Sequence, residues 1–235
     1  MTSISAPATD TEYHDAFHKD RDTWVFDLDN TLYAAECSLF DQIDRKIGEY
    51  VQSLLQLDAP EARKVQKGYL LEFGTTLSGL MANHKVDPAH YLASVHDVDF
   101  SPIQHDEKLR AGIKALDGRK LVFTNADHPY ATEIMKRLGV LDLFDDIFDI
   151  VAADLKPKPT ASVYDTFINK YDIDPDRAVM FEDMVRNLKP AHDLGMATVW
   201  VNTGSIWGVA EYDADYVHAE TPRLNNWLYD FAHSR

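Results

Sequence analysis

The sequence predicts an α/β protein in which a doubly wound parallel sheet has a helical block inserted after its first strand. From about residue 104 onward, short apolar runs alternate with stretches whose apolar residues recur at helical spacing. This alternation is typical of a parallel sheet that helices cover on both faces. Residues 38–98, by contrast, follow an apolar run at 23–26 and have a helical pattern throughout.

Four helices are expected in the inserted block. The first carries apolar residues at helical spacing, namely Phe40, Ile43, Ile47, Val51 and Leu54. The second begins at Pro60, because proline is favoured in a first helical turn, and it ends at Phe73, because Gly74 interrupts it. Residues 76–85 and 87–95 give two shorter helices.

Strands and helices alternate through the remainder of the chain. After a helix over 109–116, the expected strands are 120–123, 147–152, 178–181 and 198–201, and the helices between them end near Leu138, Tyr171 and Leu194. We therefore expect residues 1–21 to form a flexible tail. Residues 22–36 and 102–235 should form the α/β core, and residues 37–101 a separate helical domain.

The composition limits the possible functions. The 235 residues are 45% hydrophobic and 26% charged, with a formal net charge of −16. This acidity argues against nucleic acid or an anionic membrane as partner. No apolar run approaches the roughly 20 residues of a membrane-spanning helix. Cys37 is the only cysteine, so no intrachain disulfide can form and we expect a cytoplasmic protein. The oligomeric state cannot be read from the sequence.

The first strand ends on two aspartates, Asp27 and Asp29. In an extended backbone alternate side chains point the same way, so the two carboxylates would share one face. Two like charges at a strand end need compensation, for which a divalent cation is suited. A simple turn is the alternative. A calcium loop is excluded because Leu32 and Ser38 stand where it needs glycine and glutamate.

Three further polar groups follow later strands. Thr124 and Asn125 come after the second strand, Glu182 and Asp183 after the fourth, and a Lys-Pro-Lys-Pro loop, residues 156–159, after the third. Ligands of open parallel sheets bind beyond the carboxyl ends of the strands. If the sheet is doubly wound, all of these groups face one crevice.

In these four motifs the chain resembles the haloacid dehalogenase superfamily of phosphohydrolases. The match covers roughly residues 22–220, and the helical block resembles the helical cap of that superfamily. Within it, Leu32-Tyr33 and the segment 69–77 resemble the pyrimidine 5′-nucleotidase family. The resemblance implies a hydrolase that cleaves a phosphate monoester of a small molecule.

The resemblance also implies roles for the aspartates. Asp27 would attack phosphorus and become an aspartyl-phosphate. Asp29 would protonate the leaving oxygen and later activate water. Asp27, the backbone carbonyl of Asp29 and Asp183 would bind Mg²⁺. A dehalogenase does not need the acid, so Asp29 favours phosphate esters. Cys37, an alternative nucleophile, has no histidine partner apparent in the sequence.

The remaining motif residues would hold the phosphate. Thr124, Asn125 and Lys156 would bind its oxygens, and Lys156, the first lysine of the Lys-Pro-x-Pro motif, would also offset charge on Asp27. Residues that support this shell would be Thr31, Glu182 and Asn187.

The leaving group is expected to contact the cap. Tyr69, Thr75 and Thr76 could bind a base, whereas Phe73 is as well explained by helix packing. The resemblance favours pyrimidine nucleoside 5′-monophosphates such as UMP and CMP. The alternatives are a phosphatase of small metabolites, such as sugar phosphates or phosphoglycolate, and an inactive metal- and phosphate-binding module.

Overall fold

A parallel sheet forms the centre of the protein. The structure is a computed structural model that describes residues 17, 20–209 and 214–233. Its strands are β1 (Thr23–Phe26), β2 (Arg119–Phe123), β3 (Asp146–Phe148), β4 (Ala178–Glu182), β5 (Ala197–Val201) and β6 (Ala219–Thr221). Within these residues they form one six-stranded sheet in the order β3-β2-β1-β4-β5-β6. Each paired strand is parallel to its neighbours, so the predicted fold class is confirmed.

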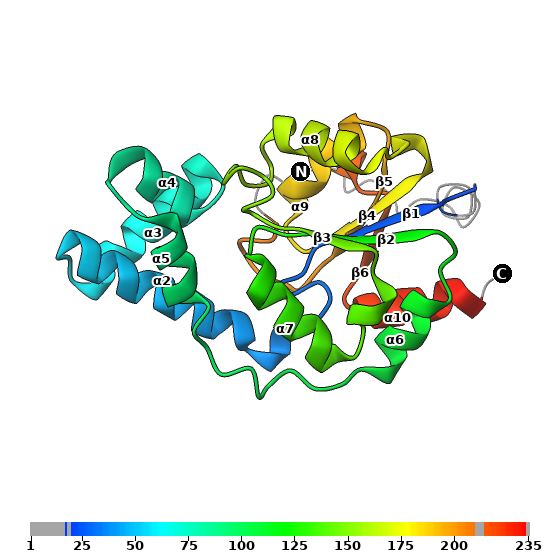
Figure 1. Cartoon of the computed structure of the whole chain (residues 1–235), viewed down its shortest axis with the longest axis horizontal. Coiled ribbons are helices and arrows are strands. Elements are labelled where there is room, and N and C mark those ends of the chain that lie inside the picture. The colour runs from blue at the N-terminus through cyan, green and yellow to red at the C-terminus, as the bar shows by residue number, and fades with distance from the viewer. Residues whose placement is uncertain (1–16, 18–19, 210–213, 234–235) are drawn as a thin grey trace, which may run out of the picture.

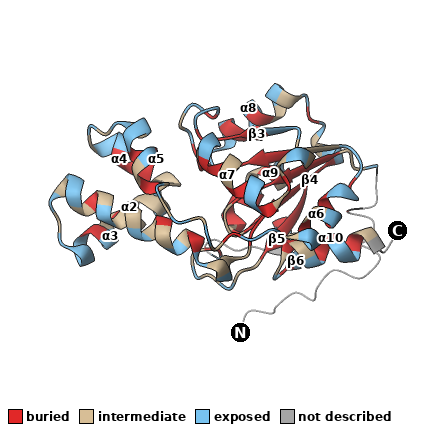
Figure 2. Cartoon of the chain, turned by 60° about the horizontal axis from the view of Figure 1, so that its bottom comes forward, coloured by how far each residue is buried: buried red, intermediate tan, exposed pale blue. Residues whose placement is uncertain are grey.

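Helices cover both faces of this sheet (Figure 1). On one face lie α6 (Glu107–Lys114), α7 (His128–Leu138) and α10 (Leu224–His233), and on the other lie α8 (Ala161–Tyr171) and α9 (Val185–Asp193). Trp24 and Phe26 point to the first face and Val25 to the second, as the two-residue period of a strand requires. Figure 2 shows the strands as the buried centre of the molecule.

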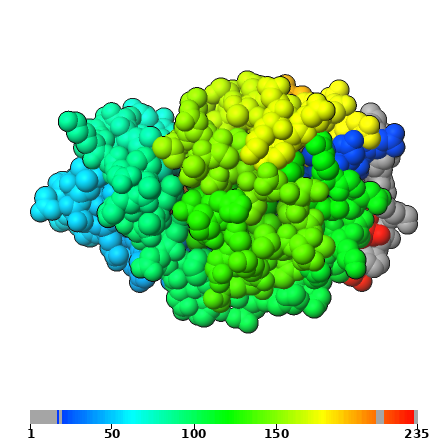
Figure 3. Space-filling view, in the orientation of Figure 1, coloured from blue at the N-terminus to red at the C-terminus, as the bar shows by residue number. Residues whose placement is uncertain are grey.

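Four helices between β1 and α6 form a group beside the sheet, which we call the cap. They are α2 (Leu39–Leu55), α3 (Ala59–Phe73), α4 (Thr76–Asn83) and α5 (Pro88–Val95). The cap has its own apolar cluster, which includes Val51, Leu80 and Tyr91. Figure 3 shows it covering one end of the molecule.

Polar residues begin three of the cap helices. Asp58, Thr75 and Asp87 each accept a hydrogen bond from a backbone N–H of the following turn. The break predicted at Gly74 is confirmed, since α3 ends at Phe73 and Gly74 has a φ of 83°.

Two predicted segments differ from the structure. The third strand ends at Phe148 rather than at residue 152, because the chain turns over residues 150–155 with Asp154 and Leu155 at positive φ. Most of the predicted tail, residues 1–21, lies outside the described residues. Phe17 within it is buried against Trp227, with ring centroids 5.3 Å apart, so this residue packs with the core. No helix of the described chain has both the length and the apolar character to cross a membrane.

Candidate functional site

The polar strand ends meet beside the cap. Asp27 follows β1, Thr124 follows β2, and Glu182 and Asp183 follow one another at the end of β4. β1 pairs with both β2 and β4, which brings the three strand ends together where the strand order reverses. These residues line a cavity of about 530 Å³ whose other wall is formed by cap helices. The predicted convergence is therefore confirmed.

The lysine that contacts Asp27 is Lys158. Its Nζ lies 2.7 Å from Asp27 Oδ1, 3.2 Å from Glu182 Oε2 and 2.7 Å from the Phe123 carbonyl oxygen. The Lys156 side chain is instead 58% exposed, and its Nζ lies 3.7 Å from Asp154. The prediction that Lys156 offsets the charge of Asp27 and binds the phosphate is therefore wrong. Burial disfavours the ammonium group, but Asp27 and Glu182 outweigh it and raise the pKa of Lys158.

The Asn125 side chain explains why Lys158, and not Lys156, reaches Asp27. Its Oδ1 accepts the Lys158 backbone N–H at 2.8 Å, and its Nδ2 donates to the Lys158 carbonyl at 3.2 Å. The amide thus holds the Lys158 backbone at both polar groups, and the buried Nζ reaches Asp27. Asn125 was predicted to bind phosphate, but its side-chain polar atoms are occupied by this loop. Thr124 is 1% exposed, lines the cavity, and accepts a bond from the Ala126 N–H.

Asp29 turns its side chain toward two tyrosines. Its Oδ1 accepts the Tyr33 hydroxyl at 2.5 Å and the Tyr130 hydroxyl at 2.8 Å. Burial and the neighbouring charge of Asp27 raise the pKa of Asp29 to about 6, although both hydrogen bonds act in the opposite direction. A carboxyl group with this pKa can hold and give up a proton near neutral pH.

Three buried carboxylates form a candidate cation site. Oxygen atoms of Asp27, Glu182 and Asp183 lie within 4.8 Å of one another. Burial and the neighbouring Asp27 raise the pKa of Glu182 to about 8, and burial with the neighbouring Glu182 raises that of Asp183 well above its usual range. Such crowding is relieved when a cation binds.

Glu182 is the least available of these three carboxylates. Its Oε1 accepts the Asn187 amide and its Oε2 accepts Lys158. Both oxygens of Glu182 are therefore engaged within the protein, and a supporting role for Glu182 and Asn187 stays a prediction. Asp183 receives a longer hydrogen bond of 3.5 Å from Asn30. The hard oxygens of Asp27 and Asp183 fit Mg²⁺.

The cap residues singled out by the sequence differ in their positions. Thr75 and Thr76 line the cavity, but Thr75 accepts the Ser78 N–H and Thr76 donates to the Gln66 carbonyl. Tyr69 does not line it, because its hydroxyl bonds to His84 and its ring packs edge-on against Phe73. The expectation of a base contact at Tyr69 is therefore not supported.

A different group of cap residues faces the cavity. Gln66 is 1% exposed and donates to Asp44 Oδ1 at 2.8 Å, and Lys67 Nζ donates to the same oxygen at 2.8 Å. Lys67 also lies 4.9 Å from the ring centroid of Trp207, which belongs to the loop after β5. The cap is joined to the core across the cavity by four side chains, those of Asp44, Gln66, Lys67 and Trp207. No sequence motif marked them.

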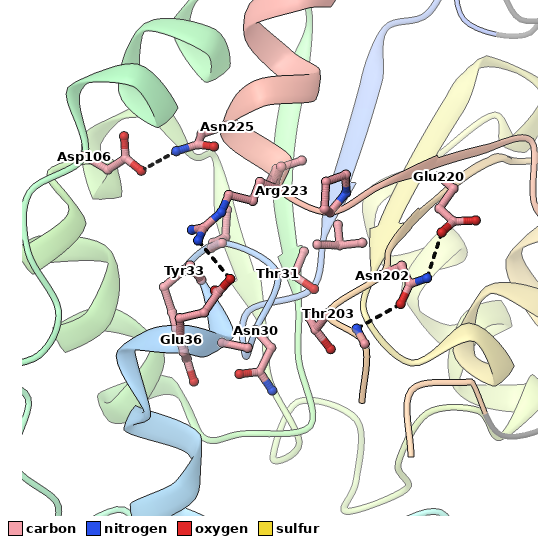
Figure 4. A pocket seen from close by; sticks show the side chains of 17 residues that line it. Asn30, Thr31, Tyr33, Glu36, Asp106, Asn202, Thr203, Glu220, Arg223 and Asn225 are labelled. Carbon is pink, nitrogen blue, oxygen red and sulfur yellow. Dashed lines mark hydrogen bonds and ion pairs between the residues drawn. The ribbon is translucent and has the colours of Figure 1, made fainter. Parts of the chain in front are cut away.

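A second cavity of about 500 Å³ adjoins the first, and Asn30 and Gly204 line both. Figure 4 shows its lining, in which Arg223 pairs with Glu36 at 2.8 Å, Asp106 accepts a hydrogen bond from Asn225, and Glu220 accepts one from Asn202. Thr31 also lines it, and its buried Oγ1 has no hydrogen-bond partner among the described residues. The excess of carboxylates makes this cavity unsuited to a phosphate.

Cys37 is the alternative nucleophile named from the sequence. It lines neither of the two cavities, and burial raises the pKa of its thiol. A raised pKa lowers the thiolate fraction, so the structure does not support Cys37 as the nucleophile.

Comparisons with known proteins point to one family. A family model of haloacid dehalogenase-like hydrolases matches residues 22–195. Phosphate metabolism protein 8 from Saccharomyces cerevisiae is 30% identical over 138 residues, which are 54% of this chain and 43% of that protein. The match thus spans less than half of the yeast protein.

Solved structures share the fold at low sequence identity. A HAD phosphatase from Thermococcus onnurineus has a TM-score of 0.59 and 17% identity over 91% of this chain and 97% of its own. The HAD-hydrolase YfnB from Bacillus subtilis, bound to magnesium, has a TM-score of 0.58 and 15% identity over 91% of this chain and 99% of its own. CbbY from Rhodobacter sphaeroides, in complex with phosphate, has a TM-score of 0.58 and 17% identity over 90% of this chain and 96% of its own.

Proposed function

Because the chain belongs to the haloacid dehalogenase-like hydrolase family, we propose that it is a Mg²⁺-dependent phosphomonoesterase acting on pyrimidine nucleoside 5′-monophosphates. The observation that carries the hydrolytic part is the buried contact between Asp27 and Lys158, next to a carboxyl group, Asp29, whose pKa is about 6. A nucleophile, a counter-charge and a proton donor thus line the same cavity.

The first step transfers the phosphoryl group to the enzyme. A carboxylate oxygen of Asp27 forms a bond to phosphorus as the bond from phosphorus to the ester oxygen breaks. Asp29 gives its proton to that leaving oxygen, so the nucleoside departs as a neutral alcohol. Lys158 holds Asp27 in place and offsets the charge that gathers near the phosphorus.

The second step releases phosphate. Asp29, now a carboxylate, takes a proton from water, and the water oxygen bonds to phosphorus while the bond to Asp27 breaks. Asp29 regains its proton and Asp27 its charge. Thr124, 1% exposed at the cavity, would hold a phosphate oxygen throughout, and phosphate in the CbbY structure supports a site of this type.

Asp27, Asp183 and the Asp29 backbone carbonyl would hold Mg²⁺. The ion would supply positive charge for the phosphate oxygens and keep Asp27 ionised. Two observations support it: the raised pKa values of Glu182 and Asp183, which burial and then the neighbouring carboxylates cause, and magnesium in the YfnB structure.

The cap side of the cavity supports a nucleotide as substrate. Trp207 offers an aromatic face, and Gln66, Lys67 and Asp44 offer fixed donors and acceptors at the same wall. A polar, planar base is recognised by such a combination of stacking and a few hydrogen bonds. The resemblance of residues 32–33 and 69–77 to pyrimidine nucleotidases directs the proposal to UMP and CMP.

A phosphatase screen tests both parts of the proposal. The full chain is assayed with UMP, CMP, AMP, GMP, a sugar phosphate and phosphoglycolate, with Mg²⁺ and with a chelator. Asp27→Asn serves as the preparation control, because an amide is a poor nucleophile and this variant should lose all turnover. We expect UMP and CMP to have the highest kcat/KM.

The outcomes separate the two parts. Turnover that survives chelation, or that persists in Asp27→Asn, contradicts the proposed mechanism. Equal or faster hydrolysis of phosphoglycolate or the sugar phosphate contradicts only the nucleotide preference.

A further inference from the structure

Both connections between the cap and the core pass beside Asp29. Tyr33 lies on the outgoing connection, between β1 and α2, and its hydroxyl donates to Asp29. The returning connection begins at His96, directly after α5, and the His96 ring stacks on Tyr130 with centroids 4.3 Å apart and planes at 17°. Tyr130, on α7 of the core, donates to the same aspartate.

The two tyrosines hold one oxygen of this carboxyl group. Both hydroxyls donate to Oδ1 of Asp29, at 2.5 and 2.8 Å, and no hydrogen bond within the described residues reaches Oδ2. Oδ1 then has little capacity to bear a proton, since two donors already point at it. The proton that Asp29 transfers must therefore reside on Oδ2, and Asp29 lines the catalytic cavity.

The surroundings keep the tyrosines in this arrangement. Tyr33 is 4% and Tyr130 3% exposed, so both tyrosines are buried. A buried hydroxyl without a partner is costly, and besides Asp29 these two have only each other, at 3.5 Å, among the described residues. His96 limits movement of the Tyr130 ring, since His96 Nδ1 also lies 3.1 Å from Asp127 Oδ1 at the start of α7.

We propose that Tyr33 and Tyr130 are positioning residues that fix the rotamer of Asp29 so that Oδ2 is presented to the leaving oxygen, and that His96 connects this arrangement to the cap. The proposal rests on the proposed function, since it assigns how the general acid of that reaction is held. It adds two hydroxyl groups that do not contact the substrate but determine how well Asp29 transfers its proton.

The contrast with another buried tyrosine supports a specific role. Tyr164 is also buried, and its hydroxyl donates to a backbone carbonyl, that of Asn187, at 2.6 Å. A backbone carbonyl is therefore enough to satisfy the hydrogen bonding of a buried tyrosine hydroxyl, without involving any functional side chain. Tyr33, on the outgoing connection, and Tyr130, on α7, instead converge on a single side-chain oxygen.

The test compares leaving groups of different acidity. A nitrophenolate leaves without protonation, whereas the alkoxide of a nucleotide such as UMP needs an acid. Tyr130→Phe and Tyr33→Phe should each lower kcat/KM for UMP about tenfold, part of the 10²–10⁴-fold that a general acid supplies, and change kcat/KM for p-nitrophenyl phosphate by less than about twofold. In the Asp29→Asn background the same substitutions should cause no further loss.

Tyr171→Phe is the matched control. The Tyr171 hydroxyl also donates to an aspartate, Asp146, at 2.8 Å, but Asp146 lies on β3 and neither residue lines the cavity. It should leave both kcat/KM values unchanged. Equal losses for the two substrates, or a further loss in the Asp29→Asn background, would overturn the proposal. Tyr33→Phe decides the matter if Tyr130→Phe does not fold. A wild-type chain that hydrolyses neither substrate would instead refute the proposed function.

Discussion

Lys158 Nζ lies 2.7 Å from Asp27 Oδ1, and the two side chains are 1% and 8% exposed. Neither charge is well solvated by water, so each depends on the other for compensation. Because Glu182 also contacts Lys158, one ammonium group serves two carboxylates. This contact fixes the orientation of Asp27, the proposed nucleophile.

Replacing Lys158 should therefore affect both turnover and stability. Lys158→Met should lower kcat/KM at least about 100-fold, because charge near the transferring phosphoryl group is lost. It should also lower the free energy of unfolding by about 3 kcal/mol, since two buried carboxylates lose their partner. Lys156→Met, in the same loop, should change neither. Kinetics and urea unfolding of both variants provide the measurement, and a loss confined to Lys156→Met would contradict our assignment.

Mg²⁺ should stabilise the folded chain through Asp183. A ligand that binds only the folded state raises the free energy of unfolding by about 2.7 kcal/mol at 100 times its Kd. We expect Mg²⁺ to raise the melting temperature of the wild type and to have little effect on Asp183→Asn. Because removal of one buried carboxylate relieves repulsion, that variant should melt no lower than the wild type without Mg²⁺. An equal Mg²⁺ shift in both proteins would show that the ion binds elsewhere.

Trp207 should contribute to the choice of leaving group. Stacking of a base on an aromatic ring is worth about 1–3 kcal/mol, so Trp207→Ala should lower kcat/KM for UMP about tenfold and hardly change it for phosphoglycolate. Tyr229→Ala is a suitable control, since its ring is also covered by a lysine, at 4.9 Å, but lies outside the cavity. Similar losses for both substrates would argue against a stacked base.

Asp44 should make the stability of the cap depend on pH. Burial opposes ionisation of Asp44, but hydrogen bonds from Lys67 and Arg63 outweigh it and lower its pKa. The pKa of Asp44 in the folded chain is therefore lower than in the unfolded chain, where it is about 3.9. Ionised Asp44 stabilises the fold above about pH 3.9, and this stabilisation is lost as the pH falls through the pKa of the folded state.

The measurement is the melting temperature of Asp44→Asn and wild type between pH 7 and pH 3. At pH 7 we expect the variant to be less stable by about 1 kcal/mol or less, because the group is partly exposed. The difference should shrink toward pH 3. A constant difference over this range would mean that the charge of Asp44 does not matter.

The fold was largely predictable from local patterns. Buried parallel strands such as Ala178–Glu182 are continuous apolar runs, and residues such as Pro60 and Gly74 limit helices through backbone geometry alone. The short strand Asp146–Phe148 was placed with the wrong end, because an apolar run continues past it into a turn that depends on two residues at positive φ.

The sequence alone determined which side chains the polar edge of the sheet would carry, because the end of each strand follows from its apolar pattern and parallel strands present their carboxyl ends together. Asp27, Asp29, Thr124 and Asp183 were found in this way. Only the tertiary structure decided which lysine reaches Asp27, what Asn125 binds, and which tyrosines hold Asp29. Apart from the Tyr33 contact, which spans four positions, these contacts join residues about 30 to 130 positions apart. Their geometry depends on how loops and the cap pack, which no local spacing records.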